Sequence, residues 1–169
     1  MIEDPLKSQQ SARSPRLRFC LMATLAILLD QITKQIMLEI IFYPPTWIKV
    51  TAFLNLVPVW NRGMSFGILS DGGVLVPIGL TSLALVVSAW LFWMVPNFFR
   101  LQRMAATLVA GGAVGNAIDR VRFGKVVDFI DLHYGGVHWP AFNLADAAIT
   151  MGAILWGYSI LFEQEASQK

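Results

Sequence analysis

The sequence predicts a membrane protein: an all-α bundle of four transmembrane helices with a small β-sheet outside the cytoplasm. Of its 169 residues, 56% are hydrophobic and only 14% are charged, whereas soluble domains carry roughly 25% charged residues. The apolar residues gather in four stretches, each near the roughly 20 residues that a helix needs to cross a bilayer. Polar residues cluster toward one end of three of these stretches, which predicts a site at one membrane surface.

The first span is predicted over residues 19–41, after a polar and basic segment, residues 1–18, that is typical of a disordered tail. A cleaved signal peptide is the alternative for a basic start followed by an apolar core. No small-x-small cleavage site follows this core, and Asp30-Gln31 stands there instead. We therefore expect a retained helix.

The remaining spans are predicted over residues 74–95, 104–121 and 142–162. Together with the first span they form one membrane domain, residues 19–163, followed by a short cytoplasmic tail, residues 164–169. The third span carries closely spaced glycines, which predicts tight packing against a neighbouring helix.

Basic residues set the predicted orientation, because Lys and Arg favour the cytoplasmic side. They are concentrated before the first span and between the second and third: Lys7, Arg13, Arg16, Arg18, Arg100 and Arg103. With four spans these two regions lie on the same side. Both termini are therefore predicted to be cytoplasmic.

Two loops, residues 42–73 and 122–141, are then predicted outside the cytoplasm. The first mixes aromatic, β-branched and turn residues over 47–61, which predicts two or three short strands. The second contains an extended run over 125–132 that would pair with the first loop. Residues 63–69 are predicted to form a short interfacial helix.

The polar residues of the spans converge near the outer surface. Asp30 lies about 18 Å along the helix axis beyond Arg18, and Asp119 about 22 Å beyond Met104. Asp146 lies in the first turns of a helix that begins at the outer face. Ionisable groups in a bilayer are costly and by default mark a functional site.

Each polar group also has a purely structural interpretation. Asp30 and Lys34 have the i,i+4 spacing of an ion pair, with Lys34 extending outward to the lipid boundary. Asn116, Asp119 and Arg120 share one helix surface, where Asp119 would pair with Arg120. Arg120 is alternatively placed to contact a lipid phosphate.

Asn143 and Asp146 fit a helix N-cap and a first-turn acid. Asp128 lies in an apolar run, and Asp131, three positions on, is its rival for any functional role. Two carboxylates in a partly dry site share a proton, which supplies a base to activate water and an acid to protonate a leaving group. Asp128 and Asp146 are a plausible pair, although the residues alone do not rank Asp128 above Asp131, and which acid holds the proton stays open.

Other site chemistries find little support. A net charge of +2 without a basic run argues against nucleic-acid binding. The single cysteine excludes an internal disulfide. His133 and His138 flank a Gly-Gly turn without further ligands at metal spacing. No metal site or cofactor is predicted.

Several segments together resemble the lipoprotein signal peptidases (signal peptidase II). They are LDQITK at 29–34, WNRGMSFG at 60–67, GGAVGNAIDR at 111–120, VDFI at 127–130 and PAFNLADAAI at 140–149. The resemblance covers about residues 20–160, in order. The family more often has alanine where Met64 stands, and we expect this change to be tolerated.

The resemblance implies an aspartyl endopeptidase of the bacterial inner membrane, with its active site near the periplasmic surface. It would lie among membrane lipid and remove the signal peptide from diacylglyceryl-modified prolipoproteins, cutting just before the lipidated cysteine. The antibiotic globomycin would inhibit it. The catalytic pair would be Asp128 and Asp146. Supporting roles would fall to Asp30, Lys34, Asn61, Asn116, Asp119, Arg120 and Asn143. We expect a monomer.

Three other functions would use the same residues. A proton- or ion-coupled transporter needs polar groups across the bilayer, but the second span offers only Thr81, Ser82 and Ser88. A metal-dependent headgroup transferase needs acids that face the cytoplasm, and here they face outward. A structural membrane protein requires every structural interpretation to hold at once.

Overall fold

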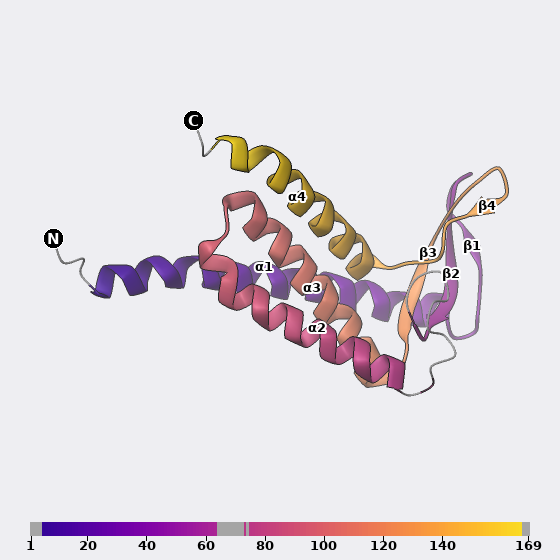
Figure 1. Cartoon of the computed structure of the whole chain (residues 1–169). Coiled ribbons are helices and arrows are strands. Elements are labelled where there is room, and N and C mark those ends of the chain that lie inside the picture. Colours follow the sequence, from indigo (N-terminus) through magenta and orange to yellow (C-terminus); the bar gives the residue numbers. More distant parts are fainter. Residues whose placement is uncertain (1–4, 64–72, 74, 167–169) are drawn as a thin grey trace.

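The computed structural model describes residues 5–63, 73 and 75–166. Four long helices run alongside one another, and a small sheet lies at one end of the bundle (Figure 1). The helices are α1 (Pro5–Ile40), α2 (Leu75–Met94), α3 (Arg100–Phe123) and α4 (Leu144–Ala166), and a short 3-10 helix, η2 (Val95–Asn97), follows α2. The start of α1 and the end of α4 lie away from the sheet.

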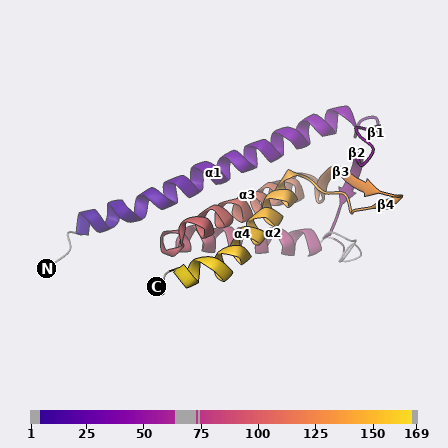
Figure 2. The ribbon, with the colours of Figure 1, turned by 90° about the horizontal axis from the view of Figure 1, so that it is seen from above.

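Helix α1 differs most from its prediction. Residues 5–18, predicted as part of a disordered tail, belong to the helix. Pro5 is compatible with a first helical turn, and the helix continues through Pro15, whose ring removes one backbone donor. The 36 residues of α1 extend about 54 Å, beyond the roughly 30 Å hydrocarbon core. Figure 2 shows α1 reaching past the other helices at its N-terminal end.

Among the described residues, three helical segments are long and apolar enough to cross a membrane: Ser14–Ile40, Leu75–Asn97 and Leu144–Phe162. These segments agree with three of the four predicted spans and indicate a multi-pass membrane protein. Helix α4 also continues to Ala166, into the segment predicted as a tail.

Helix α3 is the central helix of the bundle. It is long enough to span a bilayer but less apolar than the others, because it is rich in Gly and Ala and carries polar residues. It packs against α1, α2 and α4. Its polar residues Asn116 and Asp119 are therefore buried in protein, where they do not meet lipid.

Glycines let α3 approach its neighbours closely, as predicted. A Cβ at Gly111 would lie 2.9 Å from the Cβ of Ala26 on α1. At Gly112 it would collide with the carbonyl oxygen of Ala145 on α4, and at Gly115 it would lie 2.7 Å from Asp30 Oδ2. This packing brings the polar residues of three helices together.

The sheet joins the two predicted external loops. Its four antiparallel strands follow the order β1 (Ile48–Lys49), β2 (Leu54–Asn61), β3 (Val126–Tyr134) and β4 (Val137–His138). The predicted pairing between the loops is confirmed: Asp128 lies opposite Val59 and Asp131 opposite Asn55. The register shifts between Leu56 and Val59, around Pro58, which cannot donate to the ladder. The interfacial helix predicted over 63–69 lies outside the described residues from position 64 onward.

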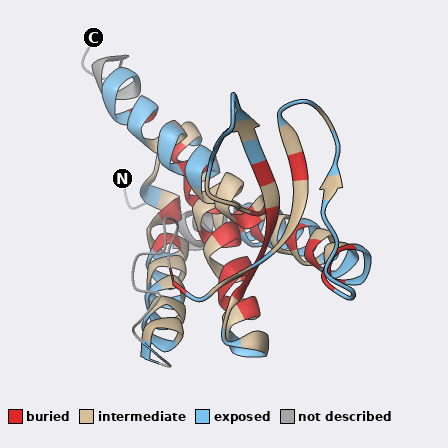
Figure 3. Ribbon diagram, turned by 90° about the vertical axis from the view of Figure 1, so that its right-hand side faces the viewer, coloured by how far each residue is buried: buried red, intermediate tan, exposed pale blue. Residues whose placement is uncertain are grey.

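The sheet is fixed to the bundle by an apolar cluster. Leu38 of α1, with Ile41 and Phe42 just after the helix, packs with Val127 and Phe129 of β3. Figure 3, viewed from the sheet end, shows buried residues along β3 and the helices behind it. The backbone of Phe142 also pairs with Ile130 of β3, which holds the start of α4 beside the strand.

Candidate active site

Asp128 of β3 and Asp146 in the first turn of α4 are linked through one residue, Asn143. The Nδ2 of Asn143 donates to Asp128 Oδ1 at 2.6 Å. The backbone N–H of Asn143 donates to Asp146 Oδ2 at 3.3 Å, and its Oδ1 accepts from the backbone N–H of Asp146 at 3.0 Å. Asn143 therefore caps α4, as predicted, and the same side chain connects the two carboxylates.

Asp128 is almost completely buried, with 1% of its surface exposed. Its second oxygen, Oδ2, accepts a hydrogen bond from Asn61 Nδ2 at 2.9 Å. Burial, with the neighbouring charge of Asp146, raises the pKa of Asp128 to about 7, while the hydrogen bonds from Asn61 and Asn143 favour its charged form. A carboxyl with this pKa exchanges its proton near neutral pH.

Asn116 of α3 connects this pair to a deeper polar cluster. Its Nδ2 donates to Asp146 Oδ1 at 2.8 Å. Its Oδ1 accepts from Lys34 Nζ at 2.9 Å and from Asn143 Nδ2 at 3.2 Å. Both oxygens of Asp146 are thus held by donors.

The deeper cluster consists of Asp30, Lys34 and Asp119. Lys34 Nζ lies 2.8 Å from Asp30 Oδ2 and 2.9 Å from Asp119 Oδ2. With Asn116, these acceptors use all three donors of the ammonium group. The predicted Asp30–Lys34 pair is confirmed, but the prediction that Lys34 extends to the lipid boundary is wrong, because only 2% of it is exposed.

Asp119 therefore pairs with Lys34 and not with Arg120 as predicted. The close approach of α1 to α3 at Gly115 brings Lys34 within reach. Arg120, one position later on the helix, turns to the other side and donates to the carbonyl oxygen of Gly63 at 3.3 Å.

The acids of the cluster also hold the backbone beside each member of the pair. Asp30 Oδ1 accepts from the N–H of Ala145 at 2.9 Å. Asp119 Oδ2 accepts from the N–H of Val127 at 3.1 Å. Each of these backbone groups immediately precedes an aspartate of the pair. The cluster therefore fixes the relative positions of α4 and β3.

Gln31 is a site residue that the sequence prediction missed. Its Nε2 lies 3.2 Å from Asp30 Oδ2, 3.0 Å from Asp119 Oδ1 and 3.1 Å from the carbonyl oxygen of Gly115. It joins α1 to α3 beside the ion pairs. Its signal was an amide next to Asp30 within a segment predicted to span the membrane.

Asp131, the rival of Asp128, has different partners. It accepts hydrogen bonds from Asn55 Nδ2 and His138 Nδ1, each at 2.8 Å. Burial alone would raise the pKa of Asp131, but these bonds and the positive charges of protonated His138 and His133 outweigh it and lower the pKa. Within the part of the chain described, no group of three or more potential metal ligands is found.

A cavity of about 350 Å³ opens beside the pair. Asn61, Asn116, Arg120 and Asp146 line one side of it, and α2 supplies apolar residues to the other: Leu80, Leu83, Ala84 and Val87. The site thus combines a carboxylate pair, which can transfer protons, with an apolar wall that can receive an apolar substrate.

The chain is similar to known proteins over most of its length. The family described as Signal peptidase (SPase) II matches residues 22–162, a range that includes the whole polar network. Lipoprotein signal peptidase of Syntrophotalea carbinolica is 46% identical, over 78% of this chain and 83% of its own. That of Cupriavidus taiwanensis is 44% identical, over 79% and 76%. A solved structure described as a bacterial membrane enzyme shares 31% identity and a TM-score of 0.72, over 90% of this chain and 91% of its own.

Proposed function

The chain belongs to the signal peptidase II family, and on that basis we propose that it is an aspartic endopeptidase that removes signal peptides from diacylglyceryl-modified prolipoproteins. It cuts the peptide bond just before the lipidated cysteine. One observation carries the proposal: Asn143 hydrogen-bonds to both Asp128 and Asp146. These two carboxylates are the catalytic groups.

In the proposed mechanism the two carboxylates share one proton. The ionised carboxylate accepts a proton from a water molecule, which attacks the scissile carbonyl carbon. The protonated carboxyl donates its proton to the leaving amide nitrogen. The raised pKa of Asp128 supports this sharing near neutral pH, and Asn143 holds the pair in register throughout the reaction.

In this proposal the Asp30–Lys34–Asp119 cluster positions the catalytic residues and does not itself react. It holds the N–H groups of Ala145 and Val127 and keeps the two catalytic residues at a fixed separation. Precise placement of reacting groups contributes a large part of enzymatic rate enhancement. Asn61 donates a hydrogen bond to Asp128 Oδ2, and Asn116 donates one to Asp146 Oδ1. These bonds orient the two carboxylates.

We further propose that α3 is a fourth transmembrane span. The helices around it shield its polar residues from lipid, so low hydropathy does not exclude it. Arg16, Arg18, Arg100 and Arg103 belong to segments at the bundle end away from the sheet, which supports cytoplasmic termini. The catalytic pair then faces the outer surface of the bacterial inner membrane, and the protein acts as a globomycin-sensitive monomer.

The test uses purified protein in detergent with EDTA present. Diacylglyceryl-modified prolipoprotein should be cleaved before its modified cysteine, and the unmodified precursor should not. Asp128→Asn and Asp146→Asn should each reduce cleavage by at least roughly 100-fold, whereas Glu39→Gln, a change to an exposed acid, should preserve it. Cleavage by either aspartate variant at a rate near that of the unmodified protein, or dependence on a divalent metal, would refute the two-aspartate mechanism.

A further inference from the structure

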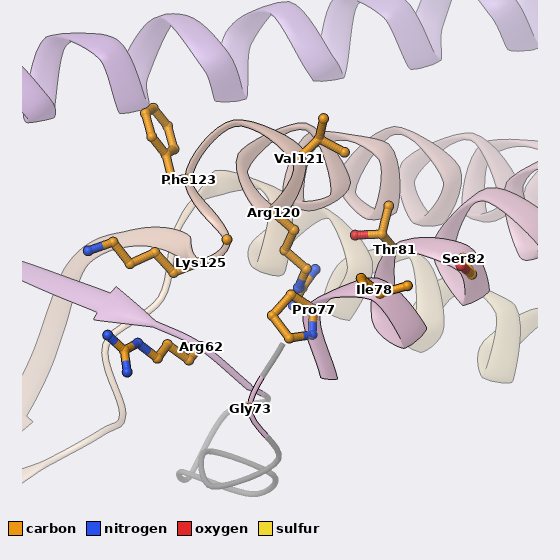
Figure 4. Close-up of a pocket in the computed structure, with 11 residues that line it drawn as sticks. Arg62, Gly73, Pro77, Ile78, Thr81, Ser82, Arg120, Val121, Phe123 and Lys125 are labelled. Atoms are coloured by element: carbon orange, nitrogen blue, oxygen red, sulfur yellow. The ribbon is translucent and has the colours of Figure 1, made fainter. Parts of the chain in front are cut away.

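A cationic cavity lies beside the active site, between the end of β2, the start of α2 and the end of α3. It encloses about 670 Å³, and Arg62, Arg120 and Lys125 contribute to its wall. Figure 4 shows these side chains around the cavity together with Thr81 and Ser82 of α2. Three cationic side chains in its described lining favour an anionic ligand.

The cations have unused binding capacity. Among the described residues, no ion pair joins Arg62 or Lys125 to an acid. Lys125 Nζ lies 4.0 Å from the ring centre of Trp60, a contact that leaves its N–H donors available. The buried Nε of Arg120 has no hydrogen-bond partner among the residues described. A buried donor without an acceptor indicates that an acceptor belongs there, and a phosphate oxygen matches guanidinium donors well.

The cavity also has an apolar side. Ile78 and Val121 line it and are 56% and 76% exposed. Thr81 lies six residues after Leu75, the first residue of α2, and therefore about 9 Å along the helix axis. The cavity thus combines charged, hydroxyl and apolar groups, the three kinds of contact that the phosphate, ester and acyl parts of a phospholipid require.

We propose that this cavity binds a glycerophospholipid with an anionic headgroup. Its phosphodiester contacts Arg62, Arg120 and Lys125, and its ester groups lie near Thr81 and Ser82. An acidic peptide segment would satisfy the cations but would leave the apolar side unused, which favours the lipid. The site is distinct from the peptidase substrate cavity, although Arg120 lines both, and its occupancy does not depend on peptide cleavage.

The test measures lipid binding to the full-length protein by native mass spectrometry from detergent. Phosphatidylglycerol and phosphatidylcholine with identical acyl chains are the probes, and we expect a clear preference for phosphatidylglycerol. The Arg62→Gln/Lys125→Gln variant should weaken phosphatidylglycerol binding roughly tenfold. The matched pair Lys49→Gln/Arg100→Gln, which removes the same charge from exposed positions outside the cavity, should leave it unchanged.

A second variant, Thr81→Trp, fills the cavity without altering charge and should also weaken lipid binding. It carries the test if the double variant does not fold, as judged by circular dichroism. Equal binding of both lipids by the unmodified protein, or equal losses in the cavity and control variants, would overturn the proposal. Displacement of the lipid by equimolar inorganic phosphate or by an acidic peptide would overturn it too, since the site would then recognise an anion alone.

Discussion

Asp128 and Asp131 lie on the same strand, three residues apart, and the structure gives them opposite chemistry. Both are buried, with 1% and 6% of their surfaces exposed, and each accepts hydrogen bonds from two side chains. The pKa of Asp128 is raised to about 7, whereas the pKa of Asp131 is lowered. Asp128 lies where β3 meets the helices, beside the acid Asp146. Asp131 lies nearer the turn between β3 and β4, beside His133 and His138.

The comparison shows that the number of hydrogen bonds does not decide proton affinity on this strand. What decides it is the balance of causes: burial and the charge of Asp146 outweigh the hydrogen bonds of Asp128, whereas the hydrogen bonds and histidines of Asp131 outweigh its burial. A buried acid beside another acid retains its proton and can take part in proton transfer. A buried acid whose hydrogen bonds and neighbouring histidines outweigh its burial stays ionised and acts as a structural ion.

The largest expected difference between the two acids is in catalysis. Asp128→Asn should reduce cleavage of modified prolipoprotein by roughly 100- to 10,000-fold, because it removes a group that transfers a proton. Asp131→Asn should change the rate little, since its partners are Asn55 and His138. Initial rates of the two variants, measured at equal concentration of folded protein, make the comparison. Similar losses in both would show that Asp128 and Asp131 do not differ in catalysis.

A second prediction concerns the helix packing that sets Asp128 apart. Gly112→Ala would force the start of α4 away from α3, because the new Cβ meets the carbonyl oxygen of Ala145. We expect a destabilisation of about 1–3 kcal/mol together with a loss of cleavage, since Asp146 follows Ala145. Thermal unfolding in detergent and the cleavage rate measure both effects.

Gly79→Ala is the matched control for this change. Gly79 lies inside α2, and a Cβ there meets nothing within 4 Å. Alanine also has the higher helix propensity, so this variant should be at least as stable as the unmodified protein. If Gly79→Ala were as damaging as Gly112→Ala, close packing of α3 on α4 would not be the cause.

A third prediction uses pH to separate the two acids. With a pKa of about 7 for Asp128, kcat/KM should fall as the pH rises through this value and the pair loses its shared proton. Asn61→Ala removes a donor that favours the charged form of Asp128. In the Asn61→Ala variant, the fall of kcat/KM on the alkaline side of the pH profile should therefore move to higher pH. Asn55→Ala, which removes the equivalent donor from Asp131, should leave this fall in place.

The smallest expected effect is that of His138→Gln. Because the folded-state pKa of Asp131 is lowered, its ionisation stabilises the fold above the ordinary Asp range and this stabilisation disappears as the pH falls through the lowered pKa. Because His138 is half-exposed, we expect the free energy of unfolding to fall by less than about 1 kcal/mol near pH 5.5. Thermal midpoints should converge for variant and unmodified protein in stronger acid. A difference that persists there would indicate lost packing and not lost charge.

Much of the scaffold could be predicted because composition and periodicity act locally. The apolar stretch over 74–95 becomes α2 (Leu75–Met94) almost residue for residue. The Asp30–Lys34 pair follows from one turn of a helix, and Asn143 caps α4 because it precedes the first turn. The family resemblance, confirmed by the comparisons, added the assignment of Asp128 over Asp131.

The sequence by itself determined which segments are helical and apolar, and at which end of each helix the polar residues lie. Only the tertiary structure decided which polar residues meet: Lys34 with Asp119, Asn143 with Asp128, and Gln31 with both acids of the cluster. The physical reason is distance between elements. A helical or extended repeat fixes the direction of a side chain about its own axis, whereas glycine-mediated packing of α3 on α1 and α4 sets the separation across which that side chain must reach.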